Sequence, residues 1–357
     1  MEKKQQVIEL WRRCFEDTED FIRFYFEQKY SDDNSLVYEE NGKALSALQM
    51  LPYPMSWENT ILQTSYISGA CTLEEARNQG IMTMLLKTAF QEMYKRGVAI
   101  STLIPAEDWL FDYYANQGYA TVFEYNLSPC FPDTNETPGN LQVHIPEAYE
   151  KETIAGFYNY FNQKLLERPC CIQHTEDDFL TIVQGLYMSQ GKLAITYTDQ
   201  SKQPTGIAFA FPHAGKVIVN EMLYESVTEK NALLNTLAKF WDTNTIECKL
   251  PVTDTSGQRL GMARVIHAGQ MLQQYAQNNP QLSLILKLND PVLPDNNGIY
   301  TLKDGQYQKT DTNEKSDIET DIPVLTKALL GYHAHLLPAP LSGLFKNCQP
   351  YMSLMLD

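Results

Sequence analysis

The stretch that decides the fold is residues 67–97, which read ISGACTLEEARNQGIMTMLLKTAFQEMYKRG. The run up to residue 73 predicts the end of a strand, and the loop Arg77-Asn78-Gln79-Gly80-Ile81-Met82 follows it. Apolar residues then recur at helical spacing: Leu85, Leu86, Ala89, Phe90 and Met93. Arg96-Gly97 is a typical helix end, so the stretch predicts a strand, a glycine loop and an amphipathic helix.

The loop before this helix has the chemistry of an anion site. Backbone N–H groups converge at a helix N-terminus, and Gly80 lets an anion approach without a Cβ in the way. No Gly-Lys-Ser/Thr follows, and the spacing is not GxGxxG, which excludes the two common nucleotide loops. Taken alone, the six residues also fit an ordinary strand–helix turn.

The residues around this stretch predict a first domain over 1–130. Its expected elements are helices within 5–30, strands at 36–38, 44–50, 61–73 and 98–104, and a short helix at 109–114. Pro52 and Pro54 are expected to interrupt the strands between residues 50 and 61.

The turn-rich segment from Cys130 to Gly139 predicts a linker to a second domain over 131–254. Expected there are helices within 147–167, 176–188 and 229–241 and strands at 192–198, 206–211 and 216–224. This order repeats that of residues 36–97, but Glu225-Ser226-Val227-Thr228 stands where the glycine loop stood. The pattern indicates a degenerate duplication.

Residues 255–357 predict a small α+β domain. Its expected elements are a strand at 264–266, a helix at 267–277, a strand at 282–288, a hairpin at 299–309 and a helix at 323–330.

Composition bounds the partners and the compartment. The net charge is −16, from 28 Lys and Arg against 44 Asp and Glu, which argues against nucleic acid and anionic membranes and mildly favours cationic small molecules. The seven cysteines show no metal-type spacing, so free thiols and no metal are expected; His333 and His335 are read as surface or packing residues. The polar start shows no apolar leader, and no run of the sequence is long and apolar enough to span a membrane. A cytoplasmic protein is therefore expected.

Two motifs together resemble a known superfamily. The Arg77–Met82 loop is similar to the pyrophosphate loop of GNAT N-acetyltransferases, and Tyr114-Ala-Asn-Gln-Gly118-Tyr119 is similar to their Tyr-x-x-x-Gly-Phe/Tyr element. Met82 departs from the loop pattern, which has a small residue there.

Over its whole length the chain resembles the Eis-type (enhanced intracellular survival) acetyltransferases. This resemblance implies an α/β chain of two tandem GNAT-like mixed-sheet domains and a small sterol-carrier-protein-like α+β domain. The third-domain features that match are Met262-Ala-Arg-Val-Ile-His267, Asn289-Asp290, Gly298-Ile-Tyr-Thr-Leu302 and Gln349-Pro350-Tyr351.

The resemblance implies an acetyl-CoA site. Backbone atoms of Ala70, Cys71, Thr72 and Leu73 would pair with the pantetheine arm as an added strand does. The residues that would hold the diphosphate are Arg77, Asn78, Gln79, Gly80, Ile81, Met82 and Thr83. Cys71 is expected to be a structural thiol, with an acyl-enzyme role as the minor alternative.

The resemblance also implies two catalytic groups. Tyr114 would protonate the departing thiolate, with the neighbouring Tyr113 as its competitor. The terminal carboxylate of Asp357 would accept the proton of the substrate amine, although the family ends in an aromatic residue. A frayed terminus is the alternative, against which stands the apolar run of residues 351–356.

The expected function is transfer of an acetyl group from acetyl-CoA to an amine of a small cationic, aminoglycoside- or polyamine-like molecule by direct attack. Carboxylates at Glu107, Asp108, Asp32 or Asp33 would attract such a substrate, or are simply solvated. One alternative is the transfer of a longer acyl group. The other is a non-catalytic ligand-binding or assembly role, in which Met82 crowds the loop. The resemblance implies a homo-oligomer, a hexamer in the family.

Overall fold

The computed structural model describes residues 2–132, 141–198, 203–252, 257–310 and 315–356. Most of the predicted linker, at 133–139, lies outside these described residues. The described chain divides into two compact units. The first holds the residues up to Phe123 together with Leu260–Pro350, and the second holds Glu124–Arg259 and Tyr351–Leu356.

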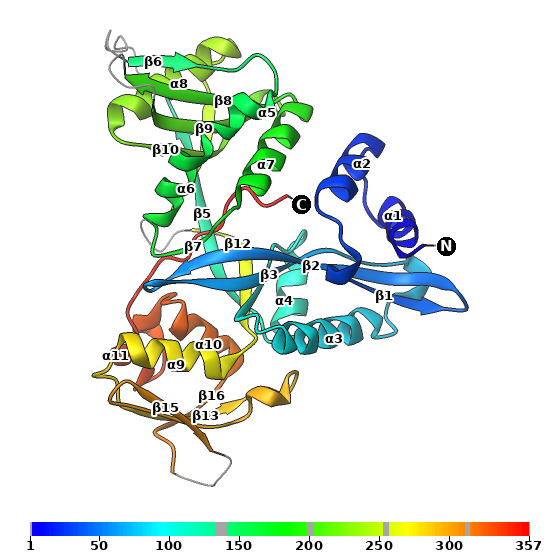
Figure 1. Ribbon diagram of the computed structural model, residues 1–357, viewed down its shortest axis with the longest axis vertical. Helices are drawn as coiled ribbons and strands as arrows, with labels where there is room; N and C mark the ends of the chain where they lie inside the picture. The colour runs from blue at the N-terminus through cyan, green and yellow to red at the C-terminus, as the bar shows by residue number, and fades with distance from the viewer. Residues whose placement is uncertain (1, 133–140, 199–202, 253–256, 311–314, 357) are drawn as a thin grey trace. The chain divides into compact units, whose positions relative to one another are not determined.

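The first unit contains the strand–loop–helix region expected from the sequence. Its early elements are α1 (Lys3–Cys14), α2 (Glu19–Gln28), β1 (Ser35–Glu40), β2 (Lys43–Trp57), β3 (Thr60–Thr72), α3 (Ile81–Lys95), β4 (Ile100–Leu103), α4 (Asp108–Ala115) and β5 (Ala120–Cys130), with short 3-10 turns at Asp32–Asn34 and Glu74–Ala76. Neighbouring strands of its sheet follow the order β1-β2-β3-β4-β12-β5. Helices α1 and α2 lie on one side of β2 and β3, and α3 lies on the other (Figure 1).

Strand β2 runs straight through the two prolines that the sequence analysis expects to interrupt it. Pro52 lies opposite Ser65 and Pro54 opposite Gln63 in the antiparallel pairing with β3. The two prolines are two residues apart, so their missing N–H groups face the same edge. Strand β1 pairs with β2 only as far as Gln49, so no ladder bond to β1 is needed at the prolines.

A bulge in β3 lies where the strand borders the predicted cofactor site. The register between β2 and β3 shifts between the pairs Ala47–Cys71 and Gln49–Ser68. Gly69 lies within this bulge and has φ +57°. A Cβ built on it would lie 2.5 Å from the Trp11 ring. The bulge therefore depends on a glycine, both for its backbone conformation and for the approach of α1.

Residues 260–350 complete the first unit. Their elements are β12 (Gln258–Val265), α9 (Ala268–Asn278), β13 (Leu284–Asn289), β14 (Gly298–Lys303), β15 (Gln306–Thr310), β16 (Ile318–Asp321), α10 (Ile322–Leu329) and α11 (Leu341–Leu344), with 3-10 turns at Pro294–Asn296 and Ala334–Leu336. The strand expected at 264–266 is longer and pairs antiparallel with β4, so it belongs to the main sheet. A separate sheet has the order β15-β14-β13-β16.

The second unit repeats the strand–helix order without the glycine loop. Its elements are β6 (Leu141–His144), α5 (Lys151–Ala155), α6 (Tyr158–Leu166), β7 (Cys170–Ile172), α7 (Glu176–Met188), β8 (Lys192–Thr198), β9 (Pro204–His213), β10 (Lys216–Tyr224), α8 (Val227–Phe240) and β11 (Ile246–Leu250). Its sheet runs β5-β11-β10-β9-β8-β6.

The last described residues are fixed in the second unit, where Tyr351 makes backbone hydrogen bonds with Cys170 (2.8 Å) and Ile172 (3.0 Å). The buried Glu221 carboxylate accepts hydrogen bonds from the Tyr351 hydroxyl (2.8 Å) and the Ser353 hydroxyl (2.7 Å). The Arg168 guanidinium pairs with Glu221 at 3.1 Å and lies 3.7 Å from the Tyr351 ring centre. The segment is anchored as far as Ser353, so fraying does not describe this part of the tail.

We expect the Gly69→Ala substitution to lower the free energy of unfolding more than Gly97→Ala does. Both glycines have positive φ, so both substitutions carry a backbone cost of about 1 kcal/mol. Only Gly69 has a neighbour in the way, because Trp11 is itself packed against Tyr25 and Phe26, which adds about 1–3 kcal/mol. Urea denaturation of the two variants measures the difference, and equal losses would contradict this packing.

Candidate active site

An opening in the sheet of the first unit forms the candidate site. Strands β3 and β4 are parallel, and their register ends at the pair Tyr66–Thr102. Strand β3 continues to Thr72, and every residue from Tyr66 to Thr72 lines a cavity of about 840 Å³. An extended ligand can therefore pair with backbone groups along this free stretch of strand.

The start of α3 gives this cavity an anion-binding end. Gly80 precedes the helix with φ +77°, and nothing lies within 4 Å of a Cβ built there. The N–H groups of Ile81, Met82 and Thr83 come before the first bond inside the helix, which Met84 donates to the Gly80 carbonyl (3.0 Å). The first turn of α3 holds no acidic residue. A phosphate group can therefore approach this backbone closely.

Two side chains frame this end of the cavity. Arg77 is exposed, lines the cavity and donates from Nε to the Thr72 carbonyl (3.1 Å), which places a cation beside the loop. Met82, the departure from the loop pattern, is half-buried and packs against the apolar core beneath α3. The cavity remains open with Met82 among its lining residues.

Tyr114 enters the same cavity from α4. It is 8% exposed, and its ring meets those of Tyr113 (5.3 Å) and Tyr119 (5.8 Å) edge-on. Burial, and to a lesser extent the neighbouring Tyr113, raise the pKa of Tyr114 above its ordinary value. The phenol is therefore protonated at neutral pH, as a proton donor must be.

Tyr113, the competitor, also lines the cavity but already has a partner. Its hydroxyl lies 3.2 Å from the Thr83 hydroxyl on the first turn of α3. Burial raises the pKa of Tyr113 as well, and the Thr83 hydrogen bond opposes that shift. Tyr113 thus links α4 to the start of α3, at the anion-binding end.

Another part of the cavity wall is aromatic and acidic, and most of its residues were not expected from the sequence. The Trp11 indole donates to Asp17 (2.8 Å), and the 60% exposed Trp109 donates to Glu107 (2.8 Å). Phe15 and Glu16 also line this wall. Of these residues only Glu107 was expected from the sequence, because residues 11–17 carry no motif.

The cavity also contains a pair of thiols. Cys14 at the end of α1 is hydrogen-bonded to Cys71 on β3, and this bond, with Arg77 and Arg13 nearby, lowers the pKa of Cys14. The same bond and burial raise the pKa of Cys71. A buried, protonated Cys71 is a poor nucleophile, which favours its expected structural role.

Most of the residues named from the sequence meet in this one cavity. Those that line it are Ala70, Cys71, Thr72, Arg77, Asn78, Gly80, Ile81, Met82, Thr83 and Tyr114. Leu73 is buried, and its N–H donates to the Leu45 carbonyl (2.9 Å). The Gln79 side chain donates to the Glu75 carbonyl (3.3 Å). Asp357 lies outside the described residues.

The corresponding turn of the second unit is unlike an anion site. The Ser226 hydroxyl accepts from the Thr228 N–H (3.1 Å) and donates to the Glu229 carboxylate (2.5 Å). Glu225 precedes this cap. Two carboxylates and a side-chain cap therefore stand where α3 offers bare N–H groups.

Comparison with known families assigns both ends of the chain. Residues 1–122 match the acetyltransferase (GNAT) domain, and residues 268–336 match the sterol carrier protein domain. The first of these domains is an enzyme domain of the acetyltransferase class, and the resemblance drawn from the sequence is confirmed. No curated protein matches the chain significantly.

Solved structures show the same architecture along the whole chain. A conserved protein of unknown function from Enterococcus faecalis, described as a probable N-acyltransferase, is 17% identical with a TM-score of 0.78 and covers 98% of this chain and 96% of its own. A GCN5-related N-acetyltransferase from Anabaena variabilis is 16% identical, with a TM-score of 0.77 and the same coverage of both chains. Eis1 from Mycobacterium abscessus is 12% identical, with a TM-score of 0.74 and the same coverage of both chains. These likenesses confirm the fold class: tandem GNAT-like domains and a sterol-carrier-like domain.

Two absences apply to the described residues. Among them, no cluster of three or more His, Cys, Asp or Glu side chains is arranged to hold a metal ion. Within the same residues, every helix is too short or too polar to span a bilayer.

We expect acetyl-CoA to bind at one site per chain in calorimetric titration, and the Gly80→Glu variant to lose this binding. A carboxylate at the start of α3 would repel the diphosphate and fill the open space at Gly80. Gly215→Glu is the matched control, because Gly215 has a similar φ of +79° and the same open surroundings in the second unit. A stoichiometry near two would contradict the degenerate second unit.

Proposed function

We propose that the chain transfers an acetyl group from acetyl-CoA to the amine of a small cationic molecule by direct attack. One observation carries the proposal: the free stretch of β3, the start of α3 and Tyr114 line a single cavity. Acetyl-CoA supplies the activated acyl group as a thioester. The unpaired edge of β3 suits the amide-bearing arm of the cofactor. The N–H groups at the start of α3, together with Arg77, suit its diphosphate.

The chain's own groups then move two protons. The substrate nitrogen attacks the thioester carbonyl carbon, and the carbon–sulfur bond breaks as the amide forms. Tyr114 donates its phenolic proton to the departing sulfur. A free thiol has a pKa of about 8.5, so the released CoA takes up one proton at neutral pH. The tyrosinate recovers its proton from solvent after the product leaves.

The acceptor end of the cavity favours a cation. Glu16, Asp17 and Glu107 line the cavity, and so does Trp109, which is 60% exposed. Carboxylates attract ammonium groups, and aromatic faces stabilise them by cation–π contact. Aminoglycosides and polyamines carry several such groups. Asp108, Asp32 and Asp33 are not among the lining residues.

We also propose that the terminal carboxylate of Asp357 accepts the proton that the attacking amine loses. Support comes from the anchoring of the preceding residues, since Tyr351 and Ser353 are held by Glu221. A carboxylate that follows an anchored segment by a few residues is suited to a repeated proton transfer at one place. Self-association into a homo-oligomer and a cytoplasmic location complete the proposal.

We expect Tyr114→Phe to lower turnover roughly ten- to a thousand-fold while the affinity for acetyl-CoA stays the same. The variant removes one hydroxyl and keeps the packed ring. A thiol-release assay with spermidine and kanamycin as acceptors measures turnover, and calorimetry measures affinity. Tyr113→Phe is the matched control and should retain most of the activity. Unchanged turnover in Tyr114→Phe would remove this residue from the mechanism.

We expect a short Gly-Ser extension after Asp357 to abolish turnover without changing the thermal midpoint. The extension moves the carboxylate but leaves the anchor at Tyr351 in place. The same extension at the N-terminus is the control. A fully active C-terminally extended protein would show that the terminal carboxylate takes no part.

A further inference from the structure

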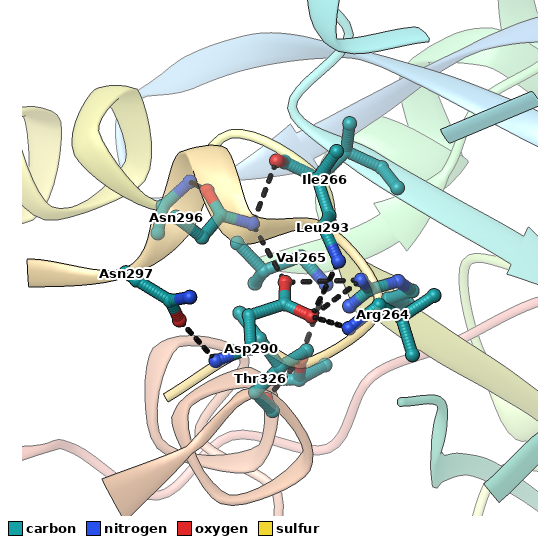
Figure 2. A network of polar contacts seen from close by, with 11 residues as sticks. Arg264, Val265, Ile266, Asp290, Leu293, Asn296, Asn297 and Thr326 are labelled. Atoms are coloured by element: carbon teal, nitrogen blue, oxygen red, sulfur yellow. Dashed lines mark hydrogen bonds and ion pairs between the residues drawn. The ribbon is translucent and has the colours of Figure 1, made fainter. Parts of the chain in front are cut away.

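A buried ion pair joins Arg264 to Asp290 (Figure 2). Arg264 on β12 is 0% exposed and Asp290, directly after β13, is 1% exposed. Arg264 Nη2 donates to both carboxylate oxygens of Asp290, at 2.9 and 3.0 Å. Both residues belong to the first unit.

The carboxylate of this pair is held from several sides. Oδ1 of Asp290 accepts the N–H groups of Val292 (3.2 Å) and Leu293 (3.0 Å). Oδ2 accepts from the Asn296 amide (2.9 Å), which also donates to the Ile266 carbonyl (3.1 Å). The guanidinium therefore rests on a fixed support, and its position is determined by the sterol-carrier-like part of the chain.

The other side of the guanidinium touches the turn after Tyr114. A Cβ built on Gly118 would lie 2.8 Å from Arg264 Nη1, so the glycine backbone packs directly on the guanidinium. Gly118 has φ +87° and ends the turn in which the Tyr119 N–H donates to the Tyr114 carbonyl (3.2 Å). Arg264 also lies 4.6 Å from the ring centre of Phe90 on α3.

Stability alone does not account for this arrangement. Arg264 Nε and Nη1 are buried, and neither has a hydrogen-bond partner among the described residues. Unpaired buried donors are costly, and a buried ion pair is seldom more stabilising than a well-packed apolar pair. Such costs are typically retained where geometry matters for function.

We propose that Arg264 is a positioning residue for the reaction, which holds the turn at Gly118 and so fixes the phenol of Tyr114 in the cavity. The contact passes from the guanidinium to Gly118 and Tyr119, whose ring meets that of Tyr114 at 5.8 Å. Tyr119 is fixed in turn by its hydroxyl, 2.7 Å from Ser101 Oγ on β4. This inference rests on the proposed role of Tyr114 as proton donor.

A double-mutant cycle between Arg264→Met and Tyr114→Phe tests the inference, with acetyl-CoA and spermidine as substrates. A phenol displaced by about 1 Å loses on the order of a hundredfold in proton transfer, so Arg264→Met should lower kcat by roughly ten- to a hundredfold. The affinity for acetyl-CoA should not change. In the Tyr114→Phe background, Arg264→Met should have no further effect on kcat.

Two more variants separate positioning from structure. Arg264→Lys keeps a charge for Asp290 but lacks the planar group that packs on Gly118, so its thermal midpoint should be retained while kcat stays low. Lys287→Met removes the exposed pair of Lys287 with Glu319 (2.9 Å) in the same part of the chain and should change neither quantity. If Arg264→Met does not fold, the cycle is run with Arg264→Lys, with the same expected result.

Each outcome decides a different point. Losses that multiply in the double variant, or a normal kcat in a folded Arg264 variant, overturn the inference and leave the role of Tyr114 intact. A Tyr114→Phe enzyme with normal turnover contradicts the proposed function, and the inference with it. A wild-type protein that releases no thiol with either spermidine or kanamycin does the same.

Discussion

The site depends on one constraint, the early end of pairing between β3 and β4. Their register stops at Tyr66 and Thr102, but β3 continues to Thr72. Backbone polar groups along a free strand edge need partners, so this stretch is suited to an extended ligand. The bulge at Gly69, the approach of Trp11 and the cavity lie along the same stretch of β3.

The two units show how little separates a candidate anion site from an ordinary turn. Each unit passes from a strand to a helix, but α3 begins at Gly80 with bare N–H groups, and α8 begins with the Ser226 cap beside Glu229. The N-terminal dipole of α3 points into open space at Gly80, and that of α8 has the Glu229 carboxylate beside it. Local side chains, not topology, decide which turn binds an anion.

Much of the fold could be predicted because periodicity and turn residues act locally. The stripe of α3, the Gly80 loop and the Tyr114–Gly118 spacing all lie within short segments of sequence. The acidic wall and the buried pair could not be predicted, because Asp17 reaches the cavity from the loop after α1 and Arg264 meets Asp290 through tertiary pairing of β12 with β4. Pro52 and Pro54 were misjudged because their effect depends on which edge of β2 is paired.

Amide hydrogen exchange with and without saturating acetyl-CoA tests the central claim most directly, since it reports on the backbone groups that the cofactor would engage. We expect exchange to slow at residues 67–72 on β3 and at residues 81–83 at the start of α3, with no change at residues 226–229. Unchanged exchange at both of the first two segments, with protection appearing at 226–229 or in the sterol-carrier-like part, would contradict the claim that the opening between β3 and β4 is the cofactor site.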